Sequence, residues 1–215
     1  CNLPSSSFSC RPAGFFLFLS PAGGYTKGAD TYVAKQGLYV NTLIDFVQRT
    51  QPKEWARFEN ANQVDPVRKF CTAFNTACET EGLLSILRHG FKHRGLRFRV
   101  CYFKPESELN EVSITNYQKN VCQCIRQWHY SPRNNSSVDM MLAVNGIPLV
   151  AIELKDQLTG QTIDDAITQW MMDRDPREEA FQFNRRILTY FAVDLYQVAM
   201  STRLLGSKTY FLPFN

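Results

Sequence analysis

The chain has 215 residues, of which 44% are hydrophobic and 20% are charged, and its formal net charge is +4. This composition excludes a disordered or low-complexity chain, and the length suits one domain with its own core. No stretch approaches the ~20 consecutive apolar residues of a membrane span. We therefore expect a soluble, globular domain that does not act in a membrane.

The seven cysteines favour a reducing environment. They form no Cys-x-x-Cys pair, their number is odd, and several lie in apolar segments where a thiol acts as a small hydrophobic group. Segment 1–22 has no periodic pattern and is left as an unplaced tail, in which a short FFLFL run only weakly suggests a secretory signal. We expect a cytoplasmic protein with one domain over 23–215.

Two helices are expected in the first half of the chain. Apolar residues in 38–49 favour one helix, which Pro52 would end soon afterwards. Asp65 and Pro66 are residue types favoured at a helix N-cap and first position, and apolar residues follow at steps of three and four up to Gly82. The second helix is therefore expected over this segment.

Strand patterns dominate the middle of the chain. Segments 98–103 and 121–128 alternate in polarity and are rich in β-branched and aromatic side chains. Segments 138–144 and 147–155 are joined by an Asn-Gly pair, which favours a two-residue hairpin turn because both residues accept a positive φ. We expect these two segments to pair as central strands.

A helix and two strands complete the predicted order. Thr162 and Asp165 have the spacing of a capping box, and apolar residues repeat at helical steps until the helix ends before Asp175. Segments 187–193 and 197–200 again have strand composition. The expected order is two helices, four strands, one helix and two strands.

Charge is segregated along the chain although the total is nearly balanced. Residues 82–133 contain nine basic and three acidic side chains, whereas residues 134–180 contain three basic and nine acidic ones. One interpretation is two solvated faces of opposite sign. The other is a surface for a nucleic-acid backbone beside an acidic metal site.

Three charged residues of the hairpin form a candidate catalytic group. Asp139 begins one strand, and Glu153 and Lys155 end the next, where alternation places the last two on one face. An acid in a buried strand costs several kcal/mol unless it is paired or binds a cation. Mg²⁺ suits such a site, with the Leu154 backbone carbonyl as a further ligand, and the lysine would act on a water or a phosphate. That chemistry is phosphodiester hydrolysis.

The same residues have a structural alternative. Glu153 and Lys155 would form an exposed rim at a strand end, and Asp139 would cap a turn with Ser136 or Ser137. Their spacing alone does not decide between the two interpretations.

The hairpin and its neighbours resemble a known family. The segment SVDMMLAVNGIPLVAIELKDQLTGQTIDDAITQWMMDRDPREEAF, with LIDFVQRTQPKEW and LLSILRHGFKHRGLRFRVCYFKPESELN upstream, is similar to the N-terminal nuclease region of the restriction (R) subunit of type I restriction-modification enzymes. The resemblance covers 23–215. It implies a PD-(D/E)xK restriction-endonuclease-like fold, which is an α/β fold with a central mixed sheet flanked by helices.

The resemblance also implies roles for individual residues. Asp139 and Glu153 match the catalytic acids of the family, and Lys155 matches its lysine. Gln169 matches the glutamine of a Gln-x-x-x-Tyr motif on the following helix, which supports the metal site and DNA contacts. Asp173 stands where that motif has tyrosine, so the chain departs from the family motif at this position.

The function implied is a Mg²⁺-dependent endonuclease, a type I site-specific deoxyribonuclease domain that cleaves double-stranded DNA in phage defence. Its expected partners are methyltransferase and specificity subunits and the helicase-like translocase domains of the full-length subunit. We expect no ATP hydrolysis by this chain, because it lacks the G-x-x-x-x-G-K-[ST] motif. Four arginines are candidates for contacts to the DNA backbone without base readout: Arg97, Arg99, Arg126 and Arg133.

The alternative function is a catalytically degenerate or truncated module that docks DNA or assembles the complex. It is supported by the absence of any acidic residue before Asp30, where family members carry a helix with a glutamate directed at the metal. Within the domain we expect a helical and basic part (23–133), a catalytic hairpin and helix (134–180) and closing strands (181–215).

Overall fold

The structure is a computed structural model that describes residues 25–28, 30–106, 110–156, 158 and 160–214. The unplaced tail 1–22 lies outside these residues. The helices and strands are, in chain order, β1 (Tyr25–Lys27), α2 (Val40–Thr50), α3 (Pro52–Ala61), α4 (Pro66–Glu81), α5 (Leu83–His89), β2 (Phe91–His93), β3 (Leu96–Phe98), α6 (Glu111–Gln118), β4 (Cys122–His129), β5 (Ser137–Val144), β6 (Ile147–Leu154), α7 (Ile163–Met172), β7 (Thr189–Val193), β8 (Val198–Ser201) and β9 (Leu212–Pro213).

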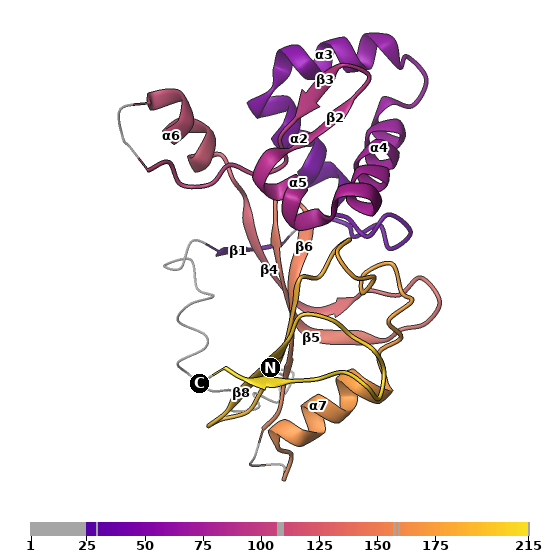
Figure 1. Cartoon of the computed structure of the whole chain (residues 1–215), viewed down its shortest axis with the longest axis vertical. Coiled ribbons are helices and arrows are strands. Elements are labelled where there is room, and N and C mark those ends of the chain that lie inside the picture. The colour runs from indigo at the N-terminus through magenta and orange to yellow at the C-terminus, as the bar shows by residue number, and fades with distance from the viewer. Residues whose placement is uncertain (1–24, 29, 107–109, 157, 159, 215) are drawn as a thin grey trace, which may run out of the picture.

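A seven-stranded mixed sheet forms the centre of the described part of the chain, in the order β1-β4-β5-β6-β7-β8-β9. Strands β4, β5 and β6 are antiparallel neighbours, whereas β1 joins β4 and β7 joins β6 in parallel. Helices α2 to α5 gather with the β2–β3 hairpin at one end of the sheet, and α7 lies near the other end (Figure 1). The predicted α/β fold with a central mixed sheet flanked by helices is confirmed, and it is consistent with a nuclease-like fold.

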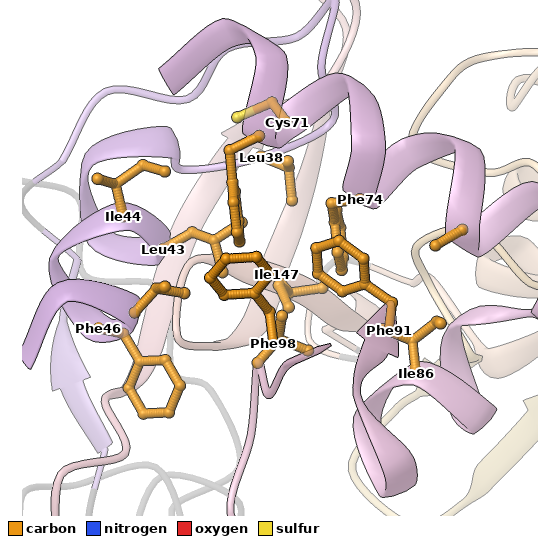
Figure 2. Close-up of a cluster of buried hydrophobic side chains, with 14 of the residues drawn as sticks. Leu38, Leu43, Ile44, Phe46, Cys71, Phe74, Ile86, Phe91, Phe98 and Ile147 are labelled. Carbon is orange, nitrogen blue, oxygen red and sulfur yellow. The ribbon is translucent and has the colours of Figure 1, made fainter. Parts of the chain in front are cut away.

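An aromatic core holds α2 to α5 and the β2–β3 hairpin together, and we call this part (residues 40–98) the helical lobe. Phe70 on α4 packs edge-on against Phe91 and Phe98 of the hairpin, with ring centres 5.5 and 5.1 Å apart. Ile147, the first residue of β6, lies within the same cluster (Figure 2). Fully burying each such side chain contributes about 1.5–3 kcal/mol, so this cluster anchors the central hairpin in the lobe.

A second core lies between α7 and the sheet. Ile163, Ala166 and Trp170 recur at steps of three and four along α7, so their buried side chains form one stripe. The Trp170 ring packs edge-on against Tyr190 of β7 at 5.2 Å between centres, and its Nε1 donates to the Phe191 carbonyl at 3.0 Å. The predicted capping box of Thr162 and Asp165 starts this helix.

The predicted helices and strands around these cores are largely confirmed. The segment expected at 38–49 forms α2, the helix after Asp65 forms α4, and the Asp65 carboxylate accepts the Arg68 N–H at 3.1 Å as its cap. Segment 121–128 forms β4, and both strands of the Asn-Gly hairpin and the two closing strands are present. No helix among the described residues has both the length and the hydropathy to cross a membrane.

The strand predicted over 98–103 is wrong beyond Phe98, where β3 ends. Amide side chains bind the backbone of the following residues in place of a neighbouring strand. The Gln51 amide accepts from Arg99 N at 2.7 Å and donates to Arg99 O at 2.8 Å, and the Asn120 amide binds Tyr102 N and O in the same way. The residue types of this segment suit a strand, but these hydrogen bonds of its backbone go to side chains of other segments.

The predicted order of elements is also wrong, because it omits α3, α5, α6 and several short strands. Pro52 was expected to follow the end of a helix, but it begins the next one. Its missing N–H and fixed φ suit the first helical turn, so α3 starts at once. Strands β1 and β9 have three and two residues, which is too short for any pattern to predict.

The Asn145-Gly146 turn joins β5 and β6 as predicted, with φ values of 51° and 79°. A Cβ on Gly146 would lie 2.4 Å from the Tyr39 carbonyl oxygen, so no side chain fits there. The Asn145 side chain is fully buried, accepts from Val121 N at 2.7 Å and donates to Val100 O at 2.8 Å. The turn therefore ties the hairpin to the segments on either side of α6.

Replacing Asn145 with alanine should lower the free energy of unfolding by about 3–5 kcal/mol. The change leaves the buried Val100 carbonyl and the partly buried Val121 N–H without this partner, at about 1–3 kcal/mol each, and puts alanine at a positive φ. Urea unfolding measures this loss. Asn184→Ala is the matched control, because Asn184 also has a positive φ of 62° but is exposed, and it should lose only about 1 kcal/mol. Equal losses in both variants would contradict this role of the buried amide.

Candidate functional site

The structure brings the four predicted site residues together at the end of the sheet that is far from the helical lobe. Asp139 is near the start of β5, Glu153 near the end of antiparallel β6, and Lys155 directly after β6. The Asp139 carboxylate accepts the Leu154 N–H at 2.9 Å, and the Lys155 ammonium donates to the Gln169 side-chain oxygen at 2.6 Å. Gln169 belongs to α7, so this helix completes the site.

A register shift in the hairpin puts Asp139 and Glu153 on one face of the sheet. Near the turn, Val144 lies opposite Ile147 and Ala143 lies opposite Pro148. Beyond the shift, the partner in β6 is one residue further along, so that Leu142 lies opposite Val150 and Met140 opposite Ile152. Continued by one residue, this register sets Asp139 opposite Glu153. Residues directly opposite in an antiparallel pair share a face, so the extra residue in β6 is needed for the two acids to meet.

Gln127 fixes the orientation of Asp139, and the sequence did not single it out. Its amide nitrogen donates to Asp139 Oδ1 at 3.0 Å, and its amide oxygen accepts from the Ser137 hydroxyl at 3.2 Å. Gln127 lies inside β4 with φ of 49°, an unusual conformation for a non-glycine residue in a strand. Such strained residues cost about 1–3 kcal/mol and cluster at functional sites. No sequence pattern reveals this conformation.

Glu153 is 1% exposed and forms a buried ion pair with Arg174, which is 6% exposed. Its Oε1 accepts from both Nη2 and Nε of Arg174, at 2.5 and 3.0 Å. Nη2 also donates to the Ser137 carbonyl at 2.8 Å, and the guanidinium lies 5.7 and 6.0 Å from the ring centres of Tyr130 and Trp170. The interpretation of Glu153 as an exposed rim residue is therefore wrong, and Arg174 is a site residue that the sequence analysis missed.

Burial dominates the electrostatics of this pair. Burial raises the pKa of the Glu153 carboxyl to about 7. The Arg174 charge acts to lower this pKa, whereas Asp139 acts to raise it through its charge and a side-chain hydrogen bond. Burial alone would lower the pKa of Arg174, but the Glu153 carboxylate outweighs it and holds that pKa above its usual range. Arg174 thus stays charged, and Glu153 exchanges its proton near neutral pH.

Lys155 and Gln169 are held together at the edge of this buried pair. The Lys155 backbone N–H donates to the Val193 carbonyl at 2.8 Å, which continues the β6–β7 pairing past the end of β6. Lys155 and Gln169 are both half-buried. Asp173, which stands in the tyrosine position of the motif, is exposed at the C-cap of α7, so no tyrosine supports Gln169 here.

The carboxyl groups of Asp139 and Glu153 fit a hard divalent cation. The two acids interact directly, and the Asp139 carboxylate also accepts from the Gln127 amide through Oδ1 and from the Leu154 N–H through Oδ2. No group of three or more His, Cys, Asp or Glu side chains with a metal-binding arrangement occurs among the described residues. Two carboxylates and the Leu154 carbonyl would leave positions for water and phosphate oxygens, as Mg²⁺ prefers.

The four arginines expected to contact DNA are spread over several segments of the chain. Arg97 is exposed on β3, and Arg126 is exposed on β4. Arg99 is half-buried, with its guanidinium 6.0 Å from the centre of the Tyr102 ring. Arg133 pairs with the buried Glu178 at 2.9 Å, which largely neutralises its charge.

Comparison with known families identifies the chain. The family model described as "Type I restriction enzyme R protein N terminus (HSDR_N)" matches residues 48–209. The chain belongs to this family. The HSDR_N match includes Asp139, Glu153, Lys155 and Gln169 and the whole sheet from β4 to β8, so the resemblance inferred from the sequence is confirmed. No curated protein matches the chain.

The raised pKa of Glu153 predicts a pH-dependent stability. Because the folded-state pKa of about 7 lies above the usual 4.5, this carboxyl contributes stability that is fully present below pH 4.5 and is lost as pH rises through 7. Between those values wild type should lose about 3 kcal/mol of unfolding free energy relative to Glu153→Gln. Urea unfolding with a metal chelator present measures the difference.

The exposed Glu59 on α3 offers the control for this measurement. Glu59→Gln should keep the wild-type pH profile. If Glu153→Gln has the same pH dependence as wild type, Glu153 does not titrate in this range.

Proposed function

We propose that this chain is the Mg²⁺-dependent endonuclease domain of a type I restriction R subunit, which hydrolyses phosphodiester bonds of double-stranded DNA. The observation that carries the proposal is the meeting of Asp139, Glu153 and Lys155 on one face of the sheet in a chain of the HSDR_N family. Two buried or half-buried acids beside a lysine match the needs of a reaction at a phosphate.

Each residue has a task that follows from its contacts. Asp139 and Glu153 would hold the ion, which when bound would stabilise charge on the phosphate and lower the pKa of a water. The Gln169 side-chain oxygen accepts a hydrogen bond from one N–H of the Lys155 ammonium, so the other two N–H groups remain for a water or a phosphate oxygen. Arg174 holds Glu153 in place through one carboxylate oxygen and leaves the other for the ion.

The proposed partners follow from family membership. The domain would act on duplex DNA together with the methyltransferase and specificity subunits of a type I complex and the translocase domains of its own subunit. It would then serve phage defence inside the cell, with the recognition sequence read elsewhere in the complex. No ATP would be consumed by this domain.

Replacing Asp139 with asparagine or Lys155 with methionine should lower the rate of plasmid nicking at least about 100-fold. The two variants should differ in metal binding. Asp139→Asn loses a ligand and should lose Mg²⁺ affinity in titration calorimetry, whereas Lys155→Met should keep it. Asp173→Asn is the control, because this exposed acid of α7 should be dispensable for both.

The second candidate is a non-catalytic module that docks DNA within the same complex. The Arg174 guanidinium favours it, since a cation of the protein already neutralises Glu153. This candidate predicts that wild type and Asp139→Asn bind Mg²⁺ equally poorly and that neither nicks DNA at high protein concentration. That result would overturn the nuclease proposal.

Replacing Gln169 with alanine should lower the nicking rate about tenfold, because Lys155 loses the acceptor that orients it. Mg²⁺ affinity should stay at the wild-type value, since Gln169 would act through the lysine. Gln161→Ala, an exposed glutamine before α7, is the control for nicking and metal titration. A loss of metal affinity in Gln169→Ala would instead make Gln169 part of the metal site.

A further inference from the structure

A hollow of about 590 Å³ lies on the helical lobe, between the end of α3, one side of α4 and the β2–β3 hairpin. It is remote from the candidate catalytic site. Strand β6 runs from Ile147 in the core of the lobe to Glu153 in the site, which is about 20 Å at ~3.3 Å per residue. The hollow therefore cannot serve the chemistry directly.

Basic side chains dominate the lining of this hollow. They are Arg68, Lys69, Lys92 and Arg94, and the lining contains one acid, Glu81. Arg68 is paired with Asp65 at 2.7 Å, but no ion pair joins the other three basic residues to an acid among the described residues. Together with Glu81, these three basic residues give the hollow a net charge of +2 around one concave surface.

The β2–β3 hairpin carries these charges at a cost to its own stability. Lys92 lies directly opposite Arg97, and both are exposed, so two like charges face each other across a two-stranded ladder. Such pairs are destabilising. Arg94 occupies the turn with φ of 47°, where Asn or Gly would be less strained. A bound polyanion would relieve the repulsion between Lys92 and Arg97.

The remaining lining residues indicate which anion fits. Thr72, Thr76 and Thr80 repeat every four residues on α4 along the hollow, and the Thr72 and Thr80 hydroxyls donate to backbone carbonyls of their own helix. The lining contains no Phe, Tyr or Trp and no large aliphatic side chain. The one ring in the lining, the imidazole of His93, packs against Phe58 at 5.8 Å between ring centres. The hollow therefore lacks the large aromatic side chains that stack unpaired bases or anchor a protein interface. The cations of the lining are therefore the groups that suit phosphate oxygens.

We propose that this hollow binds the phosphate backbone of duplex DNA, at a second contact remote from the catalytic site and without reading sequence. The inference rests on the proposed function for the identity of the ligand. Arg97 extends the same basic surface across the hairpin, so one of the four arginines expected from the sequence belongs to this contact. The contact would hold flanking DNA while the distant acids act.

The test is the triple variant Lys69→Gln, Lys92→Gln and Arg94→Gln in the full chain. Binding to a fluorescent duplex is measured over a range of salt concentrations, with a chelator present so that no cutting occurs. The logarithm of the DNA-binding constant falls linearly with the logarithm of salt concentration, and each phosphate contact contributes about 0.9 to the steepness of this line. Loss of three contacts should therefore make the line less steep by about 2.7. Affinity at 0.1 M salt should fall on the order of 100-fold.

A matched triple variant controls for net charge. Lys35, Lys104 and Lys208 are exposed, and changing each to glutamine removes the same total charge outside the hollow. This variant should keep at least most of the wild-type slope. Thermal unfolding checks that both triple variants fold. If the hollow variant does not fold, the single variant Lys92→Gln replaces it, with an expected slope change of about 0.9.

Three results would overturn the inference: equal slope changes in the two triple variants, an unchanged slope in the hollow variant, or no duplex binding by wild type. Loss of binding to a polyglutamate peptide with duplex binding intact would assign the hollow to an acidic protein surface instead. Failure of the nuclease proposal is a separate outcome, because it is read from Mg²⁺ titration and nicking of the Asp139 variant.

Discussion

The register of β5 against β6 determines the candidate site. The two-residue turn alone would set Asp139 opposite Ile152, with its side chain on the face away from Glu153. The extra residue in β6 shifts the pairing by one and brings the acids to the same face, toward α7. Pro148 adjoins this shift, and a proline in a central strand is found chiefly at such irregular positions because it has no N–H for the ladder.

The site is built at the expense of local stability. Glu153 is buried with a pKa of about 7, Gln127 has a left-handed conformation inside a strand, and Arg174 is removed from water between two aromatic rings. Buried ion pairs often contribute little net stability, because desolvation of both charges offsets their attraction. These unfavourable features lie together at the candidate site, at one end of the sheet, whereas the helical lobe has a conventional aromatic core. Departures from the usual rules of stability are expected at functional sites.

Much of this arrangement was accessible from local patterns. The Asn-Gly turn, the capped helix after Asp65 and the capping box at Thr162 each depend on residues close together in the chain, where capping and turn geometry act directly. The family resemblance depends on residue types in several segments along the chain. The prediction failed at residues 99–103, because amide side chains from distant segments bind that backbone. It also failed for α3, where Pro52 suited either the end of one helix or the start of another.

The sequence by itself determined the family, the mixed α/β class and the identities of Asp139, Glu153, Lys155 and Gln169 as candidates, since short-range spacing and residue type carry that information. Only the tertiary structure decided that the two acids share a face, that Arg174 neutralises Glu153, and that the charges of the β2–β3 hairpin surround a hollow with α4. These outcomes depend on strand register and on contacts between residues far apart in the chain, which no local pattern encodes.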